Sequence, residues 1–265
     1  MKHIKTTMIA SAIALSLGTG NVLADSWTII QEATLNTNPT TLTQNKDTSG
    51  TTNSVQAINN INLQNDNGDI IAGSTQTLNT TKNITFDQDD AGSNNIQAVN
   101  NAVTKTVTDL TQTLNSTAIQ TIKFEQGVDS ATGTGNVQAV NRVKATTVTK
   151  LNQSITGSSN ITLDFDQANS ADQDIQAGNL IDASTAGDSL ATTDDVKQTI
   201  DVLDSDMKQE DTKASIQAGN ALITAKTGVA TGKITQKFTT GTLTMLQSGA
   251  NGSVQSGNYV GVQLW

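Results

Sequence analysis

The chain has no cysteine, and its 265 residues include one histidine, His3, and one arginine, Arg142. Without cysteine, no disulfide can stabilise the fold. His3 lies in a segment that we expect to be removed, so the mature chain lacks the residues of a Ser-His-Asp triad, a Cys-His pair or a typical zinc site. We therefore predict that the protein is not an enzyme and uses no cofactor.

Positive charge is also scarce. Lys and Arg together number 15 against 24 Asp and Glu, and the formal net charge is −9. Proteins that bind nucleic acid or anionic lipid do so through clustered Lys and Arg. The composition therefore predicts no binding to nucleic acid, and no segment after the N-terminal 24 residues is apolar enough to insert in a membrane as a helix.

Aromatic residues make up only 3% of the chain, while Asn, Gln, Thr, Ser and Gly are abundant. Such a composition is ordinarily typical of disorder, because little apolar surface is available to offset the entropy of the chain. The bulky residues, however, recur in a fixed register. This periodicity predicts a folded chain.

The first 24 residues have the pattern of a secretory signal peptide. Lys2 and Lys5 precede an apolar run at 8–17, and Val-Leu-Ala at 22–24 suits a signal peptidase. The run is shorter than the roughly 20 apolar residues that span a bilayer. We expect cleavage before Asp25 and a mature protein that is secreted, either extracellular or on the cell surface.

One phrase returns six times: an aliphatic residue, Gln, a small residue, a variable residue and Asn. Successive glutamines of this phrase are 41, 41, 38, 41 and 38 residues apart. A fixed period of this length indicates an array of one supersecondary unit. We expect a single domain at 25–265 with six units, at about 25–59, 60–100, 101–141, 142–179, 180–220 and 221–258, and a terminal strand at 259–265. The repeated residues are Gln56, Gln97, Gln138, Gln176, Gln217 and Gln255, with Asn59, Asn100, Asn141, Asn179, Asn220 and Asn258.

A second pattern places an apolar residue two positions before another Gln in every unit. Residues two apart lie on the same face of a strand, and polar residues alternate with these. A third Gln-bearing segment and turn-forming clusters such as 157–160 complete each unit. The expected fold is all-β, a β-solenoid of six units with about three short strands each. The apolar residues are Leu42, Phe86, Phe124, Phe165, Met207 and Met245.

Pairing of equivalent strands about 4.8 Å apart would align Gln with Gln, Asn with Asn and Phe with Phe or Met. Each amide in such a column is satisfied by its neighbours, so it can be buried. We predict structural ladders at the Gln and Asn positions and a thin core at the apolar ones. Two alternatives stay open, namely surface amides in β-hairpins, with one turn at Asn67-Gly68, and a local helix over 192–212.

Acidic residues offer two further possibilities. Asp164 with Asp166, and Asp172 with Asp174, are pairs of a kind that could cleave a glycoside. Oxygen ligands for calcium could come from Asp87, Asp89 and Asp90 or from 65–69, although the latter lacks the downstream Glu of an EF-hand. We favour solvated turn charges and predict no catalytic or metal site, while calcium stays an alternative.

The predicted signal peptide, the absence of cysteine, the Gly/Asn/Gln/Ser/Thr-rich repeats and the fixed Gln and Asn offsets resemble the bacterial secreted amyloid-type fibre subunits of the curlin and Fap-type families. The resemblance implies an extracellular fibre subunit of a biofilm matrix or a cell surface. No individual site is carried over, because the Gln-x-x-Asn spacing and the unit length differ from the curlin pattern.

The two ends of the array are the expected assembly contacts. Trp27 and Trp265 are the only tryptophans, and Tyr259 begins an alternating segment with no unit after it. Free strand edges are templates for pairing, and large aromatic residues anchor interfaces. We expect a homopolymer, with an outer-membrane secretion channel and matrix components as further candidate partners. The alternative is a monomeric adhesin or an ice- or glycan-binding protein with a flat face, because Thr alternates at 104–108 and 240–244.

Overall fold

The structure is a computed structural model that describes residues 26–35, 41–45, 53–63, 69–71, 73–88, 93–126, 134–167, 173–183, 191–210, 213–224, 231–248 and 252–262. All regular secondary structure assigned in these ranges is β-strand, so the all-β class is confirmed. Strand β14 (Ala191–Gln209) occupies the region where a helix was the alternative. Among the described residues, no helix is long and apolar enough to cross a membrane.

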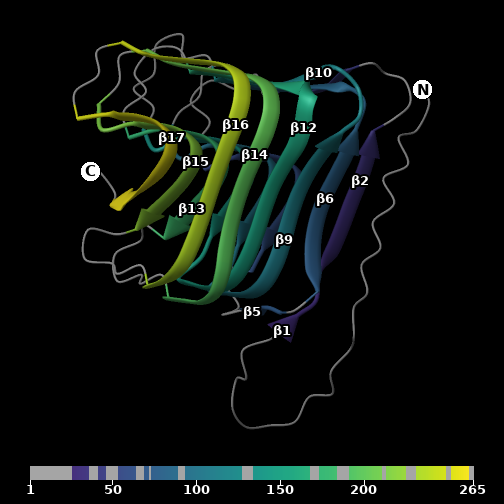
Figure 1. Ribbon diagram of the computed structural model, residues 1–265, viewed down its shortest axis with the longest axis vertical. Coiled ribbons are helices and arrows are strands. Elements are labelled where there is room, and N and C mark those ends of the chain that lie inside the picture. The colour runs from purple at the N-terminus through teal and green to yellow at the C-terminus, as the bar shows by residue number, and fades with distance from the viewer. Residues whose placement is uncertain are drawn as a thin grey trace, which may run out of the picture.

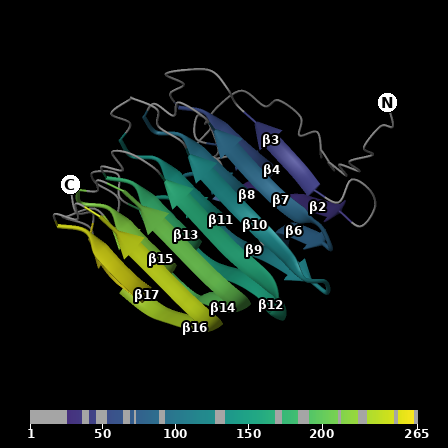
Figure 2. The ribbon, with the colours of Figure 1, turned by 90° about the horizontal axis from the view of Figure 1, so that it is seen from above.

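The smaller sheet takes one strand from each repeat. Its six strands are parallel and follow one another in chain order, as Figure 2 shows. The repeated Gln and Asn residues occupy equivalent positions in all six strands. The separate strand predicted at 259–265 is instead the second half of β17, as far as Val262. The strands are β4 (Val55–Asn62), β8 (Ile96–Val103), β11 (Val137–Lys144), β13 (Ile175–Ala183), β15 (Ile216–Thr224) and β17 (Val254–Val262).

The larger sheet has eleven strands, and all of its pairings are parallel. Early repeats contribute several short strands and late repeats a single long one. The first repeat gives β1 (Ser26–Trp27), β2 (Ile30–Leu35) and β3 (Thr41–Asn45), and the second gives β5 (Asp69–Ile70), β6 (Ser74–Thr80) and β7 (Asn83–Gln88). The others are β9 (Thr106–Ser116), β10 (Gln120–Gln126), β12 (Thr147–Gln167), β14 and β16 (Thr231–Gln247).

The predicted six-unit β-solenoid with three short strands in each unit is wrong. The chain forms two parallel sheets, and the larger one curls like half of a barrel around the smaller one (Figure 1). Strand β12 continues through 157–160, where a turn was expected, and its pairing with β14 shifts between Gly157 and Thr162. Long strands twist and coil, so neighbouring copies of 21, 19 and 17 residues curl together.

The hairpin alternative is also wrong within the described residues. Strands β4 and β5, on either side of the expected turn at Asn67-Gly68, lie in different sheets. The two turn residues themselves lie outside the described ranges.

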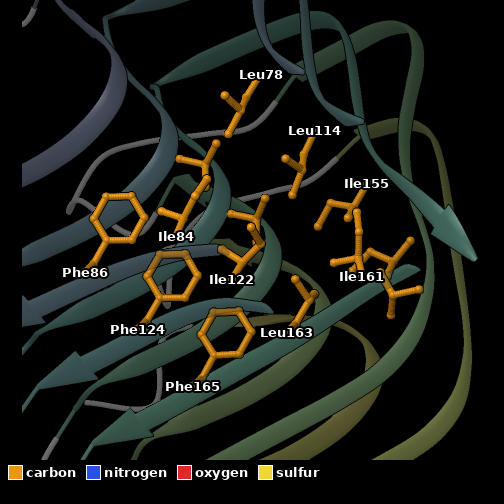
Figure 3. Packing of buried hydrophobic residues seen from close by; sticks show 14 of the residues in the cluster. Leu78, Ile84, Phe86, Leu114, Ile122, Phe124, Ile155, Ile161, Leu163 and Phe165 are labelled. Atoms are coloured by element: carbon orange, nitrogen blue, oxygen red, sulfur yellow. The ribbon is translucent and has the colours of Figure 1, made fainter. Parts of the chain in front are cut away.

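Two apolar clusters fill the space between the sheets. The first contains Val99 and Val140 of the smaller sheet and the phenylalanines of the larger one. Phe86, Phe124 and Phe165 are fully buried, and their rings stack with centroids 5.0 and 4.9 Å apart (Figure 3). The same column continues through Met207, which is buried, and Met245, which is partly buried.

Leu42 does not stand where the sequence pattern placed it. It pairs with Ile84, while Gln44 pairs with Phe86, a displacement of two residues from the predicted alignment. The side-chain periodicity of a strand is two, so a shift of two residues leaves the alternating pattern of the sequence unchanged. The first repeat is therefore out of step with the phenylalanine column.

Candidate assembly interface and its ladders

The glutamines of the repeated phrase form one column through the smaller sheet. Each Nε2 donates to the Oε1 of the preceding glutamine at 2.8 to 3.0 Å, from Gln97 onto Gln56 up to Gln255 onto Gln217. Gln138 and the three other interior members are completely buried. Burial is tolerated because a primary amide has two donors and an acceptor, and the column uses both kinds of group.

Five of these six glutamines also donate an amide hydrogen to the larger sheet and so join the two sheets. Gln97 donates to the carbonyl of Glu125 in β10 at 2.9 Å, and Gln138 donates to the carbonyl of Asp166 in β12 at 3.2 Å. The remaining contacts of this kind are from Gln56 to Asp87, Gln176 to Lys208 and Gln217 to Leu246. One side chain therefore links successive repeats and also closes the gap between the sheets.

The asparagines form a second column that donates in the opposite direction. Asn59 donates through Nδ2 to Oδ1 of Asn100 at 2.8 Å, and the series ends with Asn220 donating to Asn258 at 2.8 Å. Each donor also bonds a carbonyl of the larger sheet, as Asn100 bonds Thr113 at 3.2 Å. The Gln column thus points its donors toward the first repeat, and the Asn column points them toward the last.

Two more glutamine columns run through the larger sheet, where the sequence analysis assigned no ladder. The first donates at 2.7 to 2.8 Å along Gln236, Gln198, Gln153, Gln112, Gln76 and Gln31. The second donates at 2.8 Å along Gln247, Gln209, Gln167 and Gln126. The sequence signal that could have predicted the first column is a Gln two residues before an aliphatic residue that faces the core, as in Gln76 and Leu78.

The second of these columns ends at Gln126 in the third repeat and does not reach Gln88 in the second. Nε2 of Gln126 and Oε1 of Gln88 are buried without hydrogen-bond partners, although their strands pair in register. On β3, Gln44 pairs with Phe86 and not with Gln88, so it does not continue this column. The break therefore lies next to the strand whose register departs from the repeat.

A further polar ladder precedes the strands of the smaller sheet. Ser54 N donates to Oδ1 of Asn95 at 3.0 Å, and Asn95 N donates to Oδ1 of Asn136 at 2.9 Å. In the same way, the backbone N–H of Asn136 donates to Asp174, that of Asp174 to Ser215, and that of Ser215 to Ser253. In all six repeats, the residue immediately before the ladder residue has a positive φ, between 52° and 74°. These residues are Asn53, Asn94, Gly135, Gln173, Ala214 and Gly252.

The predicted end contacts lie on opposite edges of the molecule. Trp27 is in β1 and 37% exposed. Tyr259 is in β17 and packs, partly buried, against a cluster of smaller-sheet side chains that includes Ala218 and Ala221. That burial raises the pKa of Tyr259. Trp265 lies outside the described residues. Trp27 and Tyr259 are therefore not brought together within one chain.

Exposed apolar side chains gather on the same two edges. Of the seven large ones exposed among the described residues, only Ile119 is not on an edge strand. Within the described residues, β1 to β4 and β16 and β17 each pair on one side alone. The edge side chains are Trp27, Ile30 and Val55 at the first repeat and Leu243, Leu246 and Val260 at the last.

The one arginine is buried inside the array. Arg142 donates to Oδ1 of Asn101 at 2.9 Å and lies 3.4 Å from the carboxylate of Asp182, and desolvation lowers its pKa. It thus crosses three neighbouring strands of the smaller sheet. It therefore contacts side chains of both neighbouring strands, β8 and β13.

Asp164 and Asp166 lie partly exposed on strand β12, whereas Asp174 is buried. Asp164 pairs in register with Asp206 on one side and Lys123 on the other, and partial burial raises the pKa of Asp164. Asp166 is 3.8 Å from Lys208. Asp174 serves the backbone ladder, and Asp172 lies outside the described residues.

No calcium-like cluster is seen where the chain is described. The described ranges contain no group of three Asp, Glu, His or Cys residues that could hold a metal. Asp87 is described, whereas Asp89, Asp90 and most of 65–69 are not.

Comparison of the chain with models of protein families, with curated proteins and with solved structures found no match. The arrangement of its own residues is therefore the basis for a function.

Proposed function

We propose that this protein is a structural subunit that assembles with copies of itself into fibres outside the cell. The observation that carries the proposal is the pair of open parallel edges on which six of the seven exposed large apolar side chains lie. Export rests on the predicted signal peptide at 1–24.

Edge strands present unpaired N–H and C=O groups, and natural proteins discourage pairing there with charges, proline or bulges. Strands β4 and β17, the two edges of the smaller sheet, contain no charged residue and no proline. Several exposed edge residues are also the ends of apolar rows. Val260 continues the inward row of Leu222 and Ile181. Val55 continues the row of Ile96 and Val137, which lies on the other face of the smaller sheet. A second copy on either edge would bury these side chains.

Proline at Leu243 in β16 tests this use of the edge. Ser248 N donates to Gln209 in β14, so the alternation of the strand directs the N–H of residue 243 to the open edge. Leu243→Pro should therefore leave the isolated subunit folded and suppress fibre growth after release from denaturant. Growth is measured by pelleting and negative-stain microscopy, and folding by circular dichroism.

Thr244→Pro is the matched control, because the N–H of residue 244 is directed toward β14. It should destabilise the subunit itself. A wild-type chain that stays monomeric at all concentrations would overturn the proposal in favour of a binding protein that acts as a monomer.

A further inference from the structure

The two edges are complementary in hydrogen-bonding polarity. In the glutamine column of the larger sheet, Gln236 donates to Gln198, and no described residue donates to Oε1 of Gln236. At the other end Gln76 donates to Gln31, and Gln31 has no further glutamine below it in the described structure. The last repeat thus ends the column with an acceptor and the first repeat ends it with a donor group.

The asparagine column has the reverse polarity at the same two edges. Asn258 accepts from Asn220, and no described residue accepts from its Nδ2. Asn59 donates to Asn100, and no described residue donates to its Oδ1. An edge of the last repeat placed on an edge of the first repeat would therefore continue both columns, with Gln31 donating to Gln236 and Asn258 donating to Asn59.

One outward-facing row adds complementary charge. Its interior members are hydroxyl residues, and its ends are Glu32 on the first repeat and Lys237 on the last, both exposed. Pairing in register joins them through Thr77, Thr113, Ser154 and Thr199. If a second copy continues the register, Lys237 of one copy lies next to Glu32 of the other, one strand spacing of about 4.8 Å away.

We infer that copies join head to tail, with the last repeat of one chain followed in register by the first repeat of the next, as a seventh repeat would follow the sixth. This inference rests on the proposed function and specifies its geometry. The contact is heterologous, with different surfaces on its two sides, so each added copy presents the same free edge to the next, and copies that do not close a ring form an open filament. Figure 2 shows the two edges at opposite ends of the row of strands.

Charge exchange at the two ends of that row tests the register. Lys237→Glu and Glu32→Lys each place like charges at every junction, so each variant alone should show a critical concentration for fibre formation about tenfold higher at low ionic strength. An equimolar mixture of the two should assemble as the wild type does, because every mixed junction has opposite charges. The double variant Glu32→Lys with Lys237→Glu should recover in the same way.

Lys197→Glu is the matched control, because it makes the same charge change on β14, which is covered by β16 on one side and β12 on the other. Its critical concentration should match the wild type. In about 1 M salt, where the Debye length is about 3 Å, the effect of the single variants should disappear.

The outcomes separate the two proposals. Wild-type fibres that form with no response to any charge variant, or single variants that are not rescued in mixture, would overturn the head-to-tail register and leave the fibre function standing. A wild-type chain that forms no fibres would overturn the proposed function itself.

Discussion

At the scale of single residues, the backbone before each strand of the smaller sheet is more constant than the residue that adopts it. Two Asn, two Gly, one Gln and one Ala all have positive φ there. Glycine adopts this conformation freely, whereas an alanine is strained by its Cβ. The constant feature is therefore a corner of the chain, and this is why the side chains give no repeating signal.

Replacement of Ala214 by Gly should stabilise the protein by about 0.5–1 kcal/mol, because relief of the φ of 52° exceeds the entropy that glycine adds to the unfolded chain. Urea unfolding of the monomeric subunit measures it. Ala218→Gly, in the extended and fully buried part of β15, should instead destabilise. Loss of stability in both variants would contradict the assignment of strain to residue 214.

At the scale of elements, the ladders make the cost of a substitution depend on its place in the column. Gln138 accepts from Gln176 and donates to Gln97 and to the carbonyl of Asp166. Gln138→Ala should cost about 2–4 kcal/mol, because buried partners on both sides lose a hydrogen bond. Gln255→Ala, at the edge, loses its bond to Gln217 and should cost about 1 kcal/mol. Equal losses in urea unfolding would contradict a continuous buried column.

The sequence predicted the contents of these elements better than their extent. Equivalent side chains of paired parallel strands coincide, so recurrence along the chain was enough to align Gln97 with Gln138 and Phe86 with Phe124. It could not show that β12 continues through the Gly-Ser-Ser-Asn cluster at 157–160, because these residues form an irregularity inside one strand, where the register with β14 shifts between Gly157 and Thr162. Leu42 was misplaced because a shift of two residues leaves the pattern of a strand unchanged.

At the scale of the whole molecule, the fold joins two features that a closed globular domain does not combine. Its interior is a set of columns that each repeat extends by one member, and the columns end at open edges rather than at caps among the described residues. Curling of the larger sheet does not change this, because the curl runs along the strands and the repeats succeed one another across them (Figures 1 and 2). This arrangement supports the proposal that fibres grow by addition of whole subunits.

The rise per subunit in fibres of the mature chain tests this account most directly, and helical reconstruction from electron micrographs measures it. Six parallel strands at about 4.8 Å predict a rise of about 29 Å, with the subunit fold retained. A rise of about 4.8 Å would mean that each chain forms a single layer and has abandoned the paired repeats, and it would contradict the account.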